Sequence, residues 1–409
     1  MKLHLTGPSN TKLNDTITIT GSKSESNRSL LLAALFSDIK IENISNSDDA
    51  QVMAKGLKIS EGTVDIHHAG TAMRFLTGYF ASQEGKEVVL TGSKRMTERP
   101  IEILVDALKT LGAEISYVQD EGYPPIKIKG QHILKDKVSL PANVSSQYIS
   151  SLLLIAPSLE NGLELELVGK ITSVPYIKMT LALLDEIGVT TSFEGNLIKV
   201  SPKAKVTPTT LVVESDWSSA SYFYGICALA APGTEITLSA YKKESLQGDS
   251  VLADIYTAFG VETTFSNNTV TLKKTDKKID AKNEFDLANA PDIAQTIAVT
   301  CFGLGVGCYL TGLHTLKIKE TDRLEALNTE LSKLGANIAV TDKTLTIVPS
   351  IGILEDIAID TYNDHRMAMA FAPLAMKTTI IINDAEVVSK SYPDFWNDLK
   401  QLDFGIKEL

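Results

Sequence analysis

The sequence ILVDALKTLGAEISYV, residues 103–118, contains the pattern that decides the fold. Its first half places apolar side chains three and four positions apart, as an amphipathic helix does. Gly112 follows at the point where the C-cap of a helix favours a left-handed residue, and a strand-like alternation comes after it. The stretch therefore predicts a helix that ends at a glycine and leads into a strand.

Further segments repeat this pattern along the chain. They are MTLALLDEIGVTTSF (179–193), VLADIYTAFGVETTF (251–265), LEALNTELSKLGANIAV (324–340) and FWNDLKQLDFGIKEL (395–409), with glycines at Gly188, Gly260, Gly335 and Gly405. The period is roughly 70 residues, and self-similarity at a fixed period indicates a repeat architecture of about six copies. We expect the first copy, around residues 48–66, to be shortened.

Two other elements accompany most copies. Alternating residues around polar turns predict β-hairpins at 190–202, 262–274 and 337–350. Helices that are apolar on most faces are predicted at 145–157, 218–232, 292–307 and 364–377, and such helices belong inside a bundle. We therefore expect an α/β fold of two globular domains with three repeats each, helices inside and sheets outside. A linear solenoid is the structural alternative.

Composition narrows the class of protein. A chain of 409 residues exceeds the size at which one core stops growing, which favours two domains. Its net charge of −11 argues against binding to nucleic acid or to a membrane surface. Cys227, Cys301 and Cys308 lack metal-ligand spacing and are typical of reduced, buried thiols. The N-terminus lacks the apolar core of a signal peptide, and the apolar segment 293–310 resembles a core helix more than a membrane span, so we expect a cytoplasmic protein.

Polar loops carrying Lys or Arg precede a helix in every copy. The loops are TGSKSESNRSL (20–30), TGSKRMTERPI (91–101), VGKITSVPYI (168–177), SAYKKESLQGDS (239–250), TGLHTLKIKETDRLE (311–325) and NDAEVVSKSYPDFW (383–396). Helix N-termini attract anions, and Lys or Arg adds charge-assisted pairs to phosphate or carboxylate. Recurrence at equivalent positions in an acidic protein indicates small anionic substrates held between the two domains, rather than solvated lysines.

The starts of the apolar helices carry polar residues of two kinds. Ser145 and Asp216 are explained by helix capping alone. Capping does not explain Arg366 or Arg74 in a first helical turn, where the helix dipole disfavours a cation unless an anion is bound. We therefore predict that both arginines bind a ligand.

Several of these strings resemble the EPSP synthase family of enolpyruvyl transferases. They are GSKSESNR (21–28), AGTAMR (69–74), RMTERP (95–100), SSQ (145–147), KETDRL (319–324), NDHRMAM (363–369) and KSYPDFW (390–396), together with Asp292. They occur in the family's order from the first copy to the last, so the resemblance covers the chain and is specific.

The resemblance implies two inverse α/β domains, each of three βαβαββ-type repeats, with substrates at the interdomain cleft. The first domain comprises residues 1–20 and 214–409, and the second residues 21–213. The implied reaction transfers the enolpyruvyl group of phosphoenolpyruvate to the 5-hydroxyl of shikimate 3-phosphate and releases phosphate, as in chorismate and aromatic amino acid biosynthesis. No metal or organic cofactor is implied. The expected partners are these small anions, bound by a monomer that contacts no nucleic acid or membrane.

The family's site residues carry over by position. The resemblance assigns to shikimate 3-phosphate Lys23, Ser24, Arg28, Ser145, Ser146, Gln147, Ser173, Tyr176, Asp292 and Lys319. It assigns to phosphoenolpyruvate Lys23, Gly70, Arg95, Gln147, Arg323, Arg366 and Lys390. The implied acid–base group is Lys23, Asp292 and Glu320.

The chemistry independently needs such residue types. Adding an alcohol to an enol phosphate requires a base at the hydroxyl and an acid at the methylene carbon, and eliminating phosphate reverses these proton movements. Two carboxylates in a dry cationic site are tunable to different pKa values for these roles. We hypothesise that Asp292 is the base and Glu320 the proton donor, and the order of roles among Lys23, Asp292 and Glu320 stays open. The plain alternative for Glu320 is a surface carboxylate.

Three positions depart from the family's usual pattern. His68 stands before AGTAMR where Asn is common, Phe75 follows Arg74 where Pro is common, and Thr315 replaces an Asn in the loop before Lys319. These changes bear on inhibitor sensitivity more than on the reaction.

Two rival functions remain. The sister enzyme that transfers enolpyruvyl to UDP-N-acetylglucosamine usually carries a reactive cysteine in its first repeats, but no cysteine precedes Cys227 here. A non-catalytic, anion-binding homologue would lack the acid–base residues, yet Lys23, Asp292 and Glu320 are all present.

Overall fold

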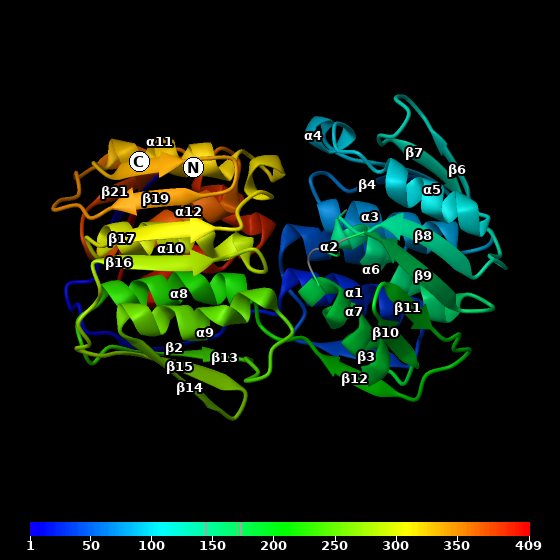
Figure 1. Cartoon of the computed structure of the whole chain (residues 1–409), viewed down its shortest axis with the longest axis horizontal. Coiled ribbons are helices and arrows are strands. Elements are labelled where there is room, and N and C mark those ends of the chain that lie inside the picture. Colours follow the sequence, from blue (N-terminus) through cyan, green and yellow to red (C-terminus); the bar gives the residue numbers. More distant parts are fainter. Residues whose placement is uncertain (144, 170, 172–173) are drawn as a thin grey trace. The chain divides into compact units, whose positions relative to one another are not determined.

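The computed structural model describes residues 1–143, 145–169, 171 and 174–409. Their contacts group the chain into two compact units. Unit 1 comprises residues 1–20 and 214–409, and unit 2 residues 21–213. Each unit has its own cluster of buried apolar side chains, so the chain forms two separately packed α/β bodies (Figure 1).

Five four-stranded sheets of the described chain share one pattern of pairing. A parallel pair occupies one edge, and an antiparallel pair completes the sheet. In spatial order, the sheets of unit 1 are β16 (Lys282–Asp286), β17 (Gly307–Thr311), β19 (Leu345–Val348) and β18 (Asn337–Val340); β14 (Val261–Ser266), β15 (Thr269–Lys274), β13 (Glu235–Ser239) and β2 (Asn14–Ile17); and β20 (Ile357–Ile359), β21 (Ile380–Ile382), β1 (Leu3–Thr6) and β22 (Gly405–Glu408). Those of unit 2 are β4 (Glu61–Asp65), β5 (Glu87–Thr91), β7 (Ile126–Lys129) and β6 (Glu114–Tyr117); and β10 (Thr191–Glu194), β11 (Leu197–Val200), β9 (Leu163–Val168) and β8 (Lys137–Pro141).

The first copy of the repeat is shortened, as predicted. Its sheet in the described part of unit 2 has two strands, β12 (Thr209–Val212) and β3 (Ile39–Glu42), which run parallel. The predicted hairpins are present in other copies as β10–β11, β14–β15 and β18–β19. After α2 (Asp48–Gly56) the chain enters β4, which pairs in parallel with β5. The hairpin that follows the corresponding helix elsewhere is therefore missing from this copy.

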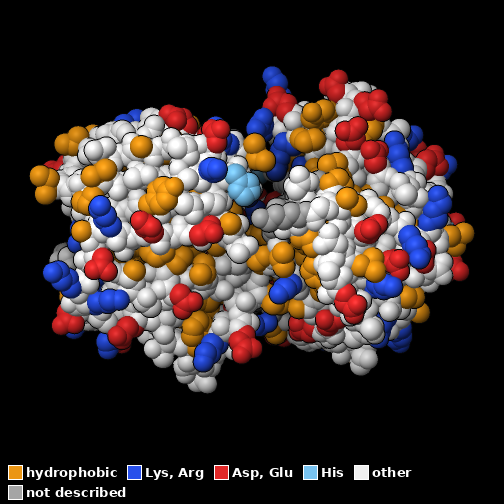
Figure 2. All heavy atoms as spheres, viewed as in Figure 1, with side chains coloured by type: hydrophobic (Ala, Val, Ile, Leu, Met, Phe, Trp, Pro, Cys, Tyr) orange, Lys and Arg blue, Asp and Glu red, His pale blue; other side chains and the backbone are white. Residues whose placement is uncertain are grey.

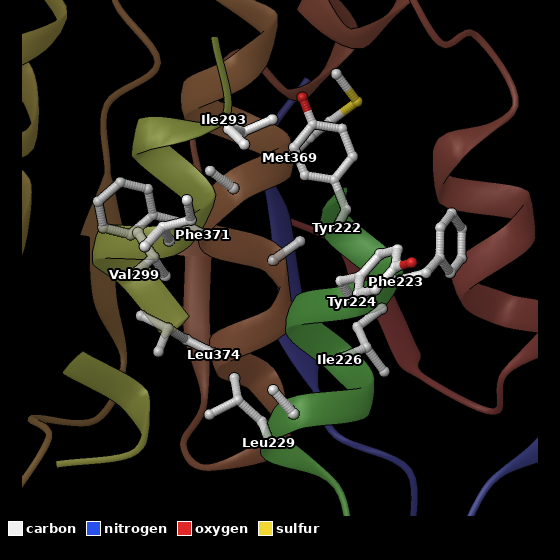
Figure 3. Packing of buried hydrophobic residues seen from close by; sticks show 14 of the residues in the cluster. Tyr222, Phe223, Tyr224, Ile226, Leu229, Ile293, Val299, Met369, Phe371 and Leu374 are labelled. Carbon is white, nitrogen blue, oxygen red and sulfur yellow. The ribbon is translucent and has the colours of Figure 1, made fainter. Parts of the chain in front are cut away.

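Three mostly buried helices lie within the described part of each unit. In unit 1 they are α8 (Trp217–Leu229), α10 (Ala294–Gly303) and α12 (His365–Phe371), and in unit 2 they are α1 (Lys23–Leu35), α3 (Gly70–Ala81) and α6 (Ser146–Ile155). Figure 3 shows Tyr222, Val299 and Met369, from the three helices of unit 1, within one core. Helices without a polar face have to be surrounded by protein, so the predicted inner layer of helices is confirmed.

The remaining helices are shorter or amphipathic. They are α4 (Lys94–Thr97), α5 (Glu102–Leu111), α7 (Val174–Glu186), α9 (Leu252–Ile255), α11 (Arg323–Lys333) and α13 (Phe395–Gln401). Short 3₁₀ segments occur at η1 (Ala156–Ser158), η2 (Gly248–Val251), η3 (Tyr256–Phe259), η4 (Pro291–Ile293), η5 (Leu316–Ile318), η6 (Ala372–Met376) and η7 (Ala385–Lys390). The helix expected in the segment 251–259 is thus one α-helical turn, α9, between η2 and η3.

The glycines of the repeat adopt left-handed backbone conformations in most copies. The φ angles of Gly112, Gly188, Gly260 and Gly335 are 114°, 77°, 73° and 99°, which confirms their predicted role at helix ends. The fifth copy differs, because Asp403 adopts the left-handed conformation (φ 62°) and Gly405 begins β22. Aspartate is among the few residues that tolerate this conformation as single residues, so the prediction for Gly405 was wrong.

No helix in the described ranges is long and apolar enough to cross a membrane. On the face shown in Figure 2, acidic and basic side chains are interspersed on the surface of each unit.

Candidate active site

Arg323 is the centre of a buried ion-pair network in unit 1. It is the first residue of α11, whose N-cap Asp322 accepts hydrogen bonds from the backbone N–H groups of Leu324 and Glu325 at 3.1 and 3.2 Å. The Arg323 side chain is only 2% exposed. A guanidinium donates through a rigid fork, and here each nitrogen of the fork serves a different carboxylate.

The three carboxylates that bind Arg323 come from different segments. Nε donates to Asp364 at 2.7 Å, Nη1 to Asp292 at 2.8 Å and Nη2 to Glu320 at 2.8 Å. Asp364 is the N-cap of α12, Asp292 lies on η4, and Glu320 precedes α11. The structure therefore brings the two predicted acid–base carboxylates, Asp292 and Glu320, onto one guanidinium.

Two further cations, Arg366 and Lys319, also contact Asp292. We call the whole group the Asp292 cluster, and its members are Asp292, Lys319, Glu320, Arg323, Asp364 and Arg366. Arg366 Nη2 donates to Asp292 Oδ2 at 3.2 Å, and its Nη1 donates to the Asp292 backbone carbonyl at 3.4 Å. Lys319 Nζ lies 3.5 Å from Asp292 Oδ1. These residues lie together in one unit, and their roles toward the substrates stay predictions.

The electrostatic state of the cluster follows from this arrangement. Burial raises the pKa of Asp292, but the positive charges of Arg366, Lys319 and Arg323 outweigh burial and hold it well below its ordinary value. Burial lowers the pKa of Arg366, but Asp292 and other anionic groups keep it above its ordinary value. Asp292 is therefore ionised at neutral pH, and its cations are largely committed to carboxylates.

Lys390 lies at the end of η7 and contacts the loop before α12. Its Nζ donates to the backbone carbonyl and the side-chain oxygen of Asn363 at 2.6 and 2.7 Å. Asn363 has a left-handed backbone (φ 58°), which turns the chain into the helix that carries Arg366. The assignment of Lys390 to phosphoenolpyruvate stays a prediction.

Arg28 is the most deeply buried cation among the predicted site residues of unit 2. It extends from α1, and its guanidinium donates to Thr180 Oγ1 (2.8 Å), Ser150 Oγ (2.9 Å) and the carbonyls of Ser24 (2.7 Å) and Tyr176 (3.5 Å). These partners are neutral, and burial lowers the pKa of Arg28 to about 10. A buried guanidinium held by neutral acceptors is well suited to bind an anion.

Two aromatic rings also face the Arg28 guanidinium. The carbon of that group lies 5.3 Å from the centre of the Phe75 ring and 6.0 Å from that of Tyr176, within reach of cation–π attraction. Phe75, where the family commonly has Pro, thus contacts Arg28, a residue predicted to bind substrate.

Lys23 and Asp49 form a second charged pair in unit 2. Lys23 is the first residue of α1, which Ser22 caps by accepting from Glu25 N. Its Nζ lies 3.9 Å from Asp49 Oδ2, and Asn27 donates to Asp49 Oδ1 at 2.7 Å. The side chain of Lys23 is 26% exposed, so it is anchored but still accessible.

The N-termini of α6 and α3 are linked by a hydrogen bond. Ser145 caps α6 by accepting from Gln147 N at 3.3 Å, as predicted, and Gln147 Nε2 donates to Thr71 of α3 at 3.1 Å. Ser146 is the first residue of α6 and is buried. Ser173 lies outside the described residues. The same kind of cap forms on α8 in unit 1, where Asp216 accepts from Ser219 N.

The arginines around the start of α3 differ from expectation. Arg95 lies on α4 with its side chain 63% exposed and pairs with Glu98. Arg99, which the sequence reasoning missed within RMTERP, lies closer, because a Cβ at Gly70 would come 2.8 Å from Arg99 Nη1. Arg74 is the fifth residue of α3, beyond its first turn, and donates to the backbone carbonyls of Gly70 and Pro100.

Sequence reasoning also missed the buried groups behind the site. Asp364 lies within the quoted NDHRMAM and Asp249 within the loop 239–250, so both were in strings that drew attention for their basic residues. Thr315, one of the departures from the family pattern, has a buried hydroxyl without a hydrogen-bond partner in the described chain. Within that part of the chain, no three His, Cys, Asp or Glu side chains come together as a metal site.

The sequence was compared with known protein families and proteins. The family model described as EPSP synthase (3-phosphoshikimate 1-carboxyvinyltransferase) matches residues 8–60 and 58–399. The 3-phosphoshikimate 1-carboxyvinyltransferase of Bacteroides fragilis (strain YCH46) is 47% identical, covering 100% of this chain and 99% of that protein. The enzyme of the same name from Haemophilus influenzae (strain ATCC 51907 / DSM 11121 / KW20 / Rd) is 36% identical, covering 95% and 96%.

Solved structures share the fold over the whole chain. EPSP synthase from Acinetobacter baumannii superposes with a TM-score of 0.82 at 22% identity, covering 100% of both chains. An enolpyruvyl transferase from Streptomyces tendae gives a TM-score of 0.75 at 15% identity, covering 99% of this chain and 98% of that one. At these identities the likeness is one of fold.

Proposed function

Since this chain belongs to the EPSP synthase family of 3-phosphoshikimate 1-carboxyvinyltransferases, we propose that its Asp292 cluster performs the proton transfers of the reaction. The chain is a transferase that moves the enolpyruvyl group of phosphoenolpyruvate to the 5-hydroxyl of shikimate 3-phosphate, in the shikimate pathway of aromatic amino acid biosynthesis. Transfer to UDP-N-acetylglucosamine and a binding-only role are not favoured.

The observation that carries the proposal is the sharing of Arg323 by Asp292 and Glu320. Each carboxylate is 2.8 Å from its own nitrogen of the guanidinium, so the two are held at a set separation. The Asp292 side chain is 15% exposed and that of Glu320 35%. We assign Asp292 to the 5-hydroxyl and Glu320, the more accessible group, to the methylene carbon of phosphoenolpyruvate.

Substrate binding adjusts the basicity of Asp292. Without substrate, three cations keep its pKa well below the ordinary range, which makes it a weak base. An anionic substrate that pairs with Arg366 or Lys319 takes part of this positive charge and adds a like charge, and both effects raise the pKa of the carboxylate. Asp292 becomes a better proton acceptor when the site is filled.

The residues of unit 2 supply further contacts to the anions. We assign Arg28, held by neutral acceptors, to shikimate 3-phosphate together with the helix starts at Ser24 and at Ser145 to Gln147, because N–H groups and the dipole at a helix start favour phosphate. Tyr176 faces the Arg28 guanidinium and completes this group. Lys23 is assigned to both substrates and to the acid–base group, since its Nζ is anchored by Asp49 yet accessible.

For phosphoenolpyruvate we assign Gly70, Arg95 and Gln147 in unit 2, with Arg323, Arg366 and Lys390 in unit 1. Arg99 is the alternative to Arg95, because its guanidinium lies against Gly70. We also propose that the enzyme acts as a cytoplasmic monomer without a metal or organic cofactor. Its three cysteines are buried and unpaired, as suits a reducing compartment.

The experiment is release of phosphate from phosphoenolpyruvate, with either shikimate 3-phosphate or UDP-N-acetylglucosamine as acceptor. We expect release only with shikimate 3-phosphate. Release with the nucleotide sugar alone would refute the acceptor assignment, and release with neither would favour a binding-only homologue.

A further inference from the structure

A chain of three hydrogen-bonded side chains extends from the Asp292 cluster into the interior of unit 1. Arg366 Nη2 donates to Ser218 Oγ at 3.2 Å. The Ser218 hydroxyl in turn donates to Asp249 Oδ2. Asp249 is only 7% exposed, and neither it nor Ser218 has a role in the assignments above.

The direction of each bond in this chain is determined by chemistry. A guanidinium has donors and no acceptor, so Ser218 must accept from Arg366. A hydroxyl has one proton to donate, and that proton is left for Asp249. The chain requires Asp249 to accept, which an ionised carboxylate always does.

The backbone around Asp249 is anchored to the start of α8. Asp249 is the second residue of η2, and Gln247 is the N-cap of that turn. The Gln247 side chain accepts from Trp217 N at 3.0 Å and donates to the Ser215 carbonyl at 2.9 Å. Since Trp217 begins α8 and Ser218 follows it, the Gln247 side chain holds the segment that carries Asp249 against the segment that carries Ser218.

Few hydrogen bonds fix the orientation of the Arg366 guanidinium. Its Nε has no hydrogen-bond partner in the described chain, and its Nη1 makes one long bond of 3.4 Å to a backbone carbonyl. Its orientation therefore depends on what Nη2 meets, namely Asp292 Oδ2 and Ser218 Oγ. One of these two partners, Asp292, is itself expected to change its charge during the reaction.

We propose that Asp249 is a positioning residue for the transfer reaction: acting through the Ser218 hydroxyl, its carboxylate holds the Arg366 guanidinium in the orientation that binds phosphoenolpyruvate. The inference rests on the proposed role of Arg366. It adds a second anion that keeps this guanidinium in place while Asp292 gains and loses a proton.

The charged groups around Asp249 give the proposal a pH dependence. Burial and the nearby Asp292 raise the pKa of Asp249 to about 6, Asp216 adds to this, and Arg366 and the bond from Ser218 oppose it. Above this pH the carboxylate accepts from Ser218. As the pH falls through about 6, a protonated Asp249 competes as a donor, and the support of Arg366 weakens.

The test is steady-state kinetics of Asp249→Asn and Ser218→Ala, with each substrate varied in turn. We expect the KM for phosphoenolpyruvate to rise roughly tenfold in both variants, as for loss of a hydrogen bond to a charged group. The KM for shikimate 3-phosphate should stay within about twofold. Because the two residues act in series, the double variant should be no worse than either single variant.

The pH profile separates positioning from structural support. The ratio of the KM for phosphoenolpyruvate in the wild type to that in Asp249→Asn should change as the pH falls through about 6, since the titration of the substrate itself is common to both enzymes. Asp254→Asn, an exposed carboxylate a few residues away on α9, is the matched control and should match the wild type throughout.

Two results would overturn the inference. One is an unchanged KM for phosphoenolpyruvate in both variants. The other is an equal rise for both substrates with a lower unfolding temperature, which shows a structural role. Arg366→Gln tests the premise separately: normal binding of phosphoenolpyruvate by that variant would remove the role of Arg366, whereas impaired binding with a normal Asp249→Asn would refute the inference alone.

Discussion

Two opposing effects act on the carboxylate of Asp292. Burial favours its neutral form, whereas Arg366, Lys319 and Arg323 favour its ionised form, and the cations win. Replacing it by Asn removes the shared counter-charge of two buried guanidiniums, at a cost of about 3 kcal/mol. We expect Asp292→Asn to lose most of its turnover and to unfold at lower denaturant concentration at pH 7.

The difference in unfolding free energy between wild type and Asp292→Asn should depend on pH in one direction. A carboxyl group whose folded pKa lies below its unfolded value stabilises the protein above the unfolded value, roughly pH 4, and this contribution is lost as the pH falls through the folded pKa. The gap in unfolding free energy between wild type and Asp292→Asn should therefore narrow below about pH 4. Urea titrations at several pH values measure it, and a gap that widens in acid would contradict the prediction.

Glu320 is tested by removal of its acidity with little change of shape. If Glu320 protonates the methylene carbon, Glu320→Gln should lower kcat by about 10²- to 10⁴-fold, the usual contribution of general acid–base catalysis. Glu325→Gln, an exposed carboxylate in the first turn of α11, is the matched control. Near-normal turnover in Glu320→Gln would reject the assignment.

The sequence indicated most residues of the candidate site in unit 1, but it did not indicate which carboxylate pairs with which cation. Asp292, Glu320 and Arg323 were identifiable because they stand in strings typical of the family. The convergence of three carboxylates on Arg323 depends on side-chain directions from separate elements, which no local pattern encodes. Asp249 escaped notice for the same reason: its partner, Ser218, lies 31 residues away in the sequence.

At the scale of elements, left-handed glycines end the helices of the repeat. Gly112 caps α5 with φ 114°, and a Cβ there would meet nothing within 4 Å. Gly112→Ala therefore tests backbone conformation alone, and we expect a loss of about 1 kcal/mol in unfolding free energy. Gly352→Ala, also without close neighbours and without a left-handed φ, should be neutral or slightly stabilising. Equal effects in urea denaturation would show that the conformation of Gly112 is not the cause.

Hairpins and buried helices were predictable from sequence because their patterns are long and periodic. The strands β14 and β15 alternate around a polar turn, and α10 is apolar on most faces. The end of the chain was less predictable, since Asp403 takes the place that glycine has in the other copies. The segment 251–259 also failed to form one helix, although its apolar spacing is that of a helix. Periodicity thus places an element more surely than it fixes its hydrogen-bonding pattern.

At the scale of the whole molecule, unit 2 has the properties of an independent folding unit. Its two ends lie close together, because a Cβ at Gly21 would come 2.6 Å from Val213 Cγ1. Its buried apolar cluster contains residues of unit 2 alone, and its size is ordinary for a domain. We expect a fragment of residues 21–213 to fold by itself and to unfold in one cooperative transition, measured by near-ultraviolet circular dichroism in urea.

The matched comparison is a fragment of residues 214–409. It lacks β1, which pairs with both β21 and β22, and β2, which forms the edge next to β13. Without β1 the sheet of unit 1 that contains the end of the chain is divided into a parallel pair and an isolated strand, and isolated strands are unstable in water. This fragment should therefore lack a cooperative transition unless a peptide of residues 1–20 is added. A broad, uncooperative transition for residues 21–213 would instead mean that unit 2 folds only in the company of the rest of the chain.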